Sequence, residues 1–82
     1  MSNREKALTR LKSKPKDFTW EELVALMNAC GYELKTTGGS GRKFVHVATG
    51  TVMYMHQPHP SNVLKAYQVR EAIDELTEKG FL

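Results

Sequence analysis

The stretch TWEELVALMNACGYELKT, residues 19–36, contains the change of pattern that decides the fold. Thr19 and Glu22 have the spacing of a capping box, in which each side chain bonds the other residue's backbone amide at the start of a helix. Apolar residues then recur every three or four positions, which predicts a helix over about 20–30. Gly31 follows where a helix commonly ends in a left-handed cap.

After this helix the hydrophobic period changes to two, the period of a strand. The segments 32–37, 42–47 and 51–56 predict three strands. A flexible glycine-rich loop, 37–41, separates the first two, and a tight Thr49-Gly50 turn separates the second from the third. The sequence therefore predicts a three-stranded antiparallel meander. Either face of the third strand, the methionine face or the Val-Tyr-His face, could point into the core.

A helical pattern returns near Leu64, after a connector that two prolines exclude from a central strand. Its apolar positions share one face, and Gly80 is placed to cap its end. Two amphipathic helices can cover one face of a small sheet. The predicted fold is therefore α+β, a two-layer sandwich of order helix-strand-strand-strand-helix, and its other sheet face stays open as a plausible binding surface.

The positive charge is concentrated at the start of the chain. Residues 1–16 contain six basic side chains and one acidic one, whereas residues 17–82 contain six basic and eight acidic ones. The sequence thus predicts a basic leader, 1–16, with at most a short helical turn that Pro15 ends, and a folded domain, 17–82. The leader could attract nucleic acid through phosphate contacts or act as a solubilising arm.

Composition excludes several classes of protein. Eighty-two residues, 40% hydrophobic and 26% charged, fit one small globular domain. No apolar run is long enough to span a membrane, and no apolar stretch follows the N-terminus as in a secretory signal. The single cysteine, Cys30, excludes an internal disulfide and a cysteine-built zinc site, so we expect a cytoplasmic protein with a buried structural thiol.

The glycine-rich loop and the strand after it contain the candidate chemistry. Backbone amides of the loop could hold a phosphate, although it lacks the Lys-Ser/Thr pair of a Walker motif. Arg42 and Lys43 follow, and His46 lies three residues further on. A histidine base and cations suffice to turn the 2′-hydroxyl of RNA on its neighbouring phosphate without a metal. The strand pattern alone favours a packed role for His46.

His56 and His59 have a spacing compatible with metal chelation. No carboxylate or cysteine lies near them in the sequence, and a zinc site normally needs three or four protein ligands. We therefore expect no metal and no other cofactor, and His56 is more simply an exposed residue at the end of a strand.

From Trp20 to Leu82 the chain resembles the HicA toxins of bacterial toxin–antitoxin pairs. The matching pieces, in order, are CGYEL at 30–34, GS at 39–40 before FVH at 44–46, PHP at 58–60, and the terminal helix at 64–82. The resemblance implies a fold like that of a double-stranded-RNA-binding domain and an mRNA-cleaving activity. It also implies RNA and a HicB-like antitoxin as partners.

The family's loop usually reads Gly-Ser-His, and its histidine is the expected catalytic base. Aligned on the loop, that position is Gly41 here, followed by Arg42; neither is a neutral base at pH 7. His46 matches a second histidine of the family and is the predicted base. The predicted RNA-binding residues are Gly39, Ser40, Arg42, Lys43 and Lys65. The alternative is a non-catalytic RNA-binding or protein-interaction module of the same fold.

Overall fold

The computed structural model describes residues 2–39 and 41–82. The predicted α+β class and the three-stranded antiparallel sheet, of order β1-β2-β3, are confirmed. One helix, α1, precedes the predicted order of elements. Ser40, one of the predicted RNA-binding residues, lies outside the described residues. The elements are α1 (Asn3–Lys12), α2 (Trp20–Ala29), β1 (Tyr32–Gly38), β2 (Gly41–His46), β3 (Val52–His56) and α3 (Ala66–Glu78).

The capping box that the sequence predicts starts α2. Thr19 Oγ1 accepts a hydrogen bond from the backbone amide of Glu22 at 3.2 Å, and a carboxylate oxygen of Glu22 accepts one from the Thr19 amide at 3.2 Å. The helix ends before Gly31, whose φ of +88° is the left-handed cap conformation. Cys30 is buried beside this cap, and burial raises the pKa of its thiol. This position fits the structural role expected of the cysteine.

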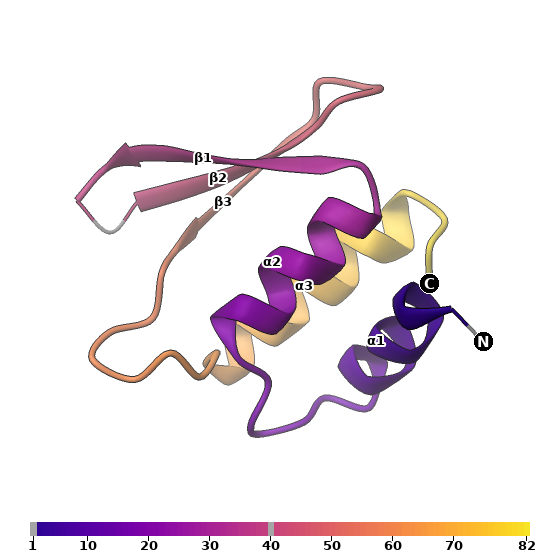
Figure 1. The fold of residues 1–82 in the computed structure, drawn as a ribbon, viewed down its shortest axis with the longest axis horizontal. Coiled ribbons are helices and arrows are strands. Elements are labelled where there is room, and N and C mark those ends of the chain that lie inside the picture. The colour runs from indigo at the N-terminus through magenta and orange to yellow at the C-terminus, as the bar shows by residue number, and fades with distance from the viewer. Residues whose placement is uncertain (1, 40) are drawn as a thin grey trace.

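The sheet is covered on one face by α2 and α3 and open on the other (Figure 1). Phe44, in the middle strand, is completely buried, and its ring lies 5.4 Å from that of Trp20 on α2. Met53 and Met55 are buried on the same side, whereas Tyr54 between them is 67% exposed. The methionine face of β3 is therefore the core face.

The helix α1 lies against α2 and α3 on the side away from the sheet (Figure 1). It is ten residues long, longer than the short turn that the sequence indicates. Its Leu8 and Leu11 are buried. Arg10 bonds a carboxylate oxygen of Glu22 at 2.8 Å and one of Asp17 at 3.2 Å. Much of the stability of this helix therefore comes from its contacts with the rest of the domain.

The first turn of α3 is joined to the end of β3 by one buried side chain. Gln68, which is 2% exposed, donates from Nε2 to the carbonyl oxygen of His56 at 2.8 Å. Its Oε1 accepts from the backbone amide of Lys65 at 2.9 Å. The far end of the helix is closed as the sequence predicts, because Gly80 has a φ of +85° and the Phe81 amide bonds the Leu76 carbonyl. The start of α3 is thereby fixed relative to the sheet.

Candidate nucleic-acid interface

The strand β2 separates the predicted site residues into two groups. Its first residue, Gly41, pairs with His56 of β3, and its last, His46, pairs with Tyr32 of β1. A strand rises about 3.3 Å per residue, so the Cα atoms of Arg42 and His46 lie roughly 13 Å apart. We call the end near Gly41 the hairpin end, comprising Gly38, Gly39, Gly41, Arg42 and His56, and the other the turn end, comprising His46 to Thr51.

At the hairpin end Arg42 is folded back onto the glycine loop. Its Nη1 donates to the carbonyl oxygens of Gly39 at 2.8 Å and Gly41 at 2.9 Å. A hollow of about 170 Å³ opens beside it. Arg42, Tyr54 and His56 are among the residues that line this hollow, and no carboxylate residue is, so its local charge favours an anion such as a phosphate. In the β2–β3 ladder Arg42 pairs with the buried Met55, whereas His56 is on the open face with Tyr54. The lining residues are Thr37, Gly41, Arg42, Tyr54, Met55 and His56.

Lys43 lies on the open face of the sheet, because consecutive residues of a strand point to opposite faces. It stands between Lys35 of β1 and Tyr54 of β3 in the two strand ladders. Lys35 has an ion pair with Glu33 at 3.7 Å, whereas Lys43 has none with the described part of the chain. Lys43 therefore adds positive charge to the open face, next to the hollow but not in its lining.

At the turn end His46 is held in a polar cluster. Its ring lies 4.8 Å from that of Tyr32, and its Nδ1 is 2.8 Å from Thr49 Oγ1. The Tyr32 hydroxyl donates to a carboxylate oxygen of Glu75 at 2.5 Å, and Lys79 pairs with the same carboxylate at 3.0 Å. The ring of His46 is thus packed, as the strand pattern favours, and stands apart from Arg42, Gly39 and the hairpin hollow.

Burial and hydrogen bonding shift the pKa values of Tyr32 and Glu75, which lie beside the turn end. Burial, together with the bond to Glu75, raises the pKa of Tyr32 above its usual range. Burial acts on Glu75 in the direction of a higher pKa, but the bonds from Tyr32 and Lys79 outweigh it and lower the pKa of that carboxyl. Both shifts preserve the neutral phenol and the charged carboxylate, which is the protonation state that this network needs.

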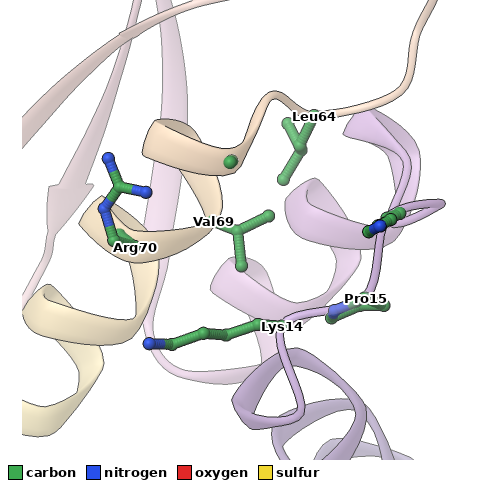
Figure 2. Close-up of a pocket in the computed structure, with 7 residues that line it drawn as sticks. Lys14, Pro15, Leu64, Val69 and Arg70 are labelled. Carbon is green, nitrogen blue, oxygen red and sulfur yellow. The ribbon is translucent and has the colours of Figure 1, made fainter.

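A second hollow, of about 280 Å³, lies where the segment between α1 and α2 meets the start of α3 (Figure 2). Figure 2 shows the side chain of Lys14 extending from that segment toward α3, with Val69 in the floor. Lys14, Lys16 and Arg70 supply positive charge at its wall, and none of the three forms an ion pair within the described ranges. Lys65 precedes α3 at the same place. The lining residues are Lys14, Pro15, Lys16, Leu64, Ala66, Val69 and Arg70.

The two hollows flank the first turn of α3. Gln68 bonds the backbone of His56, which borders the hairpin hollow, and its neighbour Val69 lines the second hollow. The structure therefore groups Gly39, Arg42 and Lys65 around this end of the molecule, and places His46 at the other. Sequence reasoning assigned His56 no part in RNA chemistry, because only the register of β2 and β3 brings it opposite Gly41.

In the part of the chain that the structure describes, no three His, Cys, Asp or Glu side chains are grouped as metal ligands would be. The same part has no helix with the length and apolar character needed to cross a membrane.

The comparisons with known proteins give one match. The family model for the HicA toxin of bacterial toxin–antitoxin systems matches residues 20–77. This span begins at α2 and reaches the last turn of α3, so α1 lies outside it. No curated protein and no solved structure is significantly similar to the chain. Because the match covers more than two thirds of its residues, the chain belongs to the HicA toxin family.

Proposed function

We propose that this protein binds mRNA across its hairpin end and cleaves it without a metal, as a toxin held in check by an antitoxin. Membership of the HicA family implies an mRNA-cleaving toxin. The observation that supports the location is the hairpin hollow, which has Arg42 and His56 among its lining residues and no carboxylate residue. A phosphodiester of single-stranded RNA offers the charge and the size that such a shallow site can accept.

The chemistry needs few groups. A base removes the proton of a ribose 2′-hydroxyl, and a cation stabilises the charge that develops on the neighbouring phosphate. The Arg42 guanidinium supplies that cation beside the backbone of Gly39 and Gly41. The sequence prediction of His46 as the base stays a prediction; its Cα atom lies roughly 13 Å from that of Arg42 along β2.

The remaining cations extend the proposed path of the RNA backbone. Lys43 continues it onto the open face of the sheet. Lys65 and the three cations of the second hollow continue it around the first turn of α3. The basic residues of the segment before α2 would thereby contribute to RNA binding.

The proposed partners are mRNA and a HicB-like antitoxin. The family pairs with antitoxins, and an unrestrained enzyme acting on mRNA would harm the cell that makes it. The proposed compartment is the cytoplasm, where its substrate is translated.

Cleavage of a mixed-sequence RNA by the purified, antitoxin-free protein in EDTA tests this function. Arg42→Gln should lower the cleavage rate at least tenfold, whereas Lys6→Gln, which removes one charge from α1 far from the hollow, should change it less than twofold. RNA binding without cleavage by the folded parent would instead support the non-catalytic RNA-binding module. Neither binding nor cleavage would support a protein-interaction module.

A further inference from the structure

We propose that the open face of the sheet is a binding site for single-stranded RNA, in which one base stacks on Tyr54 and neighbouring phosphates contact Lys35 and Lys43. This inference rests on the proposed function and names the surface that recognises the bases. The three residues form one row across the sheet, because Lys35 of β1 pairs with Lys43 of β2 and Lys43 pairs with Tyr54 of β3. We call them the open-face row.

The open-face row lies on the side of the sheet turned away from α2 and α3 (Figure 1). Consecutive residues of a strand point to opposite faces, and the residues next to the row in sequence, Leu34, Phe44 and Met55, belong to the core or pack against it. Adjacent strands are about 4.7–4.9 Å apart, so the row is roughly 10 Å long. One or two nucleotides can therefore contact all three side chains.

Tyr54 supplies an accessible ring, because its side chain is 67% exposed. Its diagonal neighbours on β2 are Gly41, which has no side chain, and Val45, which has a short one. An exposed aromatic ring is a platform on which any base can stack, since every base has a π-face. Tyr54 also lines the hairpin hollow, so this platform is continuous with the proposed site.

Lys35 and Lys43 give the row a positive charge that the protein itself compensates only in part. They lie directly opposite each other in the β1–β2 ladder, and like charges in that arrangement destabilise a sheet. Glu33 pairs with Lys35 at 3.7 Å, but both side chains are exposed, and exposed ion pairs contribute little. Lys43 has no ion pair among the described residues. A phosphate bound between the two ammonium groups relieves their repulsion, so the row is complementary in charge to an RNA backbone.

The composition of the row favours RNA over a protein as its occupant. Lysine is depleted in the buried centres of protein–protein interfaces, and two of the three residues here are lysines. Surfaces that bind single strands combine cations along the backbone with aromatic rings beneath the bases. A double strand keeps its bases stacked inside its own helix, away from the ring. The row therefore selects a single strand with unpaired bases.

The test measures the affinity of the protein for two strands of equal length: a short fluorescent RNA whose 2′-methoxy groups prevent cleavage, and a strand that lacks bases. Tyr54→Leu, which removes the ring but keeps an apolar side chain, should weaken binding of the RNA at least fivefold. Tyr54→Phe, which keeps the ring, should bind within twofold of the parent. Lys43→Gln should weaken binding of both strands and lower the slope of log affinity against log salt by about 0.7.

The strand without bases separates stacking from other effects of the substitution. Tyr54→Leu and the parent should bind this strand equally, because it offers nothing to stack on the ring. Val47→Ala, which shortens another exposed apolar side chain at the turn end, should bind both strands as the parent does. A folded Tyr54→Leu variant that binds the RNA as tightly as the parent, or that loses affinity equally for both strands, would overturn the inference.

The outcomes also separate this inference from the proposed function. A parent that binds RNA through Tyr54 but does not cleave an RNA with free 2′-hydroxyls would overturn the proposed cleavage alone. A parent that cleaves RNA while Tyr54→Leu binds it unchanged would overturn the open-face site alone. So would a parent dimer in sedimentation equilibrium that Tyr54→Leu makes monomeric with unchanged RNA affinity, since a second copy of the chain would then occupy the face. A folded parent that binds no RNA would overturn both.

Discussion

Gly41 and His56 lie opposite each other across the β2–β3 ladder, and both border the hollow that Arg42 lines. The candidate site is therefore assembled from residues of three strands rather than from one loop. The glycine loop contains no histidine in its sequence, because Gly41 and Arg42 stand where the family's loop histidine is expected. The strand register shows that His56 is nevertheless next to Gly41, on the open face of the sheet.

The crowding around Gly41 predicts a stability effect. Gly41→Ala should destabilise the protein by about 1–3 kcal/mol, because overpacking forces the hairpin to shift, and the added Cβ meets Thr37 and the Gly38 carbonyl. Urea unfolding measures the change. Thr37→Ala in the same chain should recover part of the loss, and equal losses in the single and double variants would show that Thr37 is not the obstacle.

Lys14 should contribute to RNA affinity at a cost in stability. Its φ of +55° is unfavourable for a residue with a side chain, and in this region the cost is roughly 1–2 kcal/mol. Lys14→Gly should therefore maintain or raise the urea midpoint while weakening RNA binding. The slope of log affinity against log salt should fall by about 0.7 for one lost contact with single-stranded RNA.

The control for this experiment is a substitution rather than a deletion. Removing residues 1–16 would also remove the completely buried Leu11, so lost binding could not be assigned to lost charge. Lys6→Gln should leave the salt slope unchanged. The same slope in Lys14→Gly and the parent would show that the second hollow does not contact RNA.

Tyr32 should act on stability and not on catalysis. Tyr32→Phe removes the hydroxyl that donates to the Glu75 carboxylate, and a hydrogen bond to a charged group is worth about 1.5–3 kcal/mol. Thermal or urea unfolding should show that loss, with Tyr54→Phe on the exposed face as the neutral control for stability. At a temperature where Tyr32→Phe stays folded, its rate of RNA cleavage should match that of the parent. A large loss of cleavage rate would place Tyr32 and the adjacent turn end in the active site.

The Arg10–Glu22 pair predicts a dependence of stability on acid. The hydrogen bond from Arg10 lowers the pKa of Glu22 below its ordinary value of 4.5, so folding favours the ionised carboxyl. Its contribution is complete above that ordinary value and is lost as the pH falls through the lower pKa of the folded state. The urea midpoint of the parent should therefore drop in acid. The urea midpoint of Glu22→Gln should be lower than that of the parent at neutral pH and should fall less in acid. The remaining fall is the part due to Glu75, whose pKa is also lowered. Parallel curves of urea midpoint against pH for the parent and Glu22→Gln would contradict this.

The local patterns predict most of the fold because the contacts that form it are close in sequence. The Thr19–Glu22 capping box starts α2, Gly31 and Gly80 end the helices that they follow, and the period of two marks the strands. The helix α1 is harder to predict, because its apolar face is small and because Arg10 forms its hydrogen bond with Glu22, twelve residues later in the sequence. The spacing of apolar residues along the chain does not indicate a contact of that kind.

The candidate site depends on register, which the sequence specifies less completely. Alternation allows a strand to shift by two residues without exchanging its faces, so it cannot tell which residue of β3 meets Gly41. Arg42 and His46 are close in sequence, which suggests that they form one cluster. In the structure both lie on the extended strand β2, which separates their Cα atoms by roughly 13 Å. The pairing of Gly41 with His56 emerges only when both strands are placed.

The most direct test of the central claim is to map where RNA binds. A two-dimensional amide NMR spectrum of the protein, titrated with a short single-stranded RNA carrying 2′-methoxy groups throughout, locates the contact without cleavage. The account predicts that the largest shifts occur at the hairpin end, at Gly39, Gly41, Arg42 and His56. Shifts concentrated at the turn end, around His46 and Thr49, with the hairpin end unchanged, would contradict it.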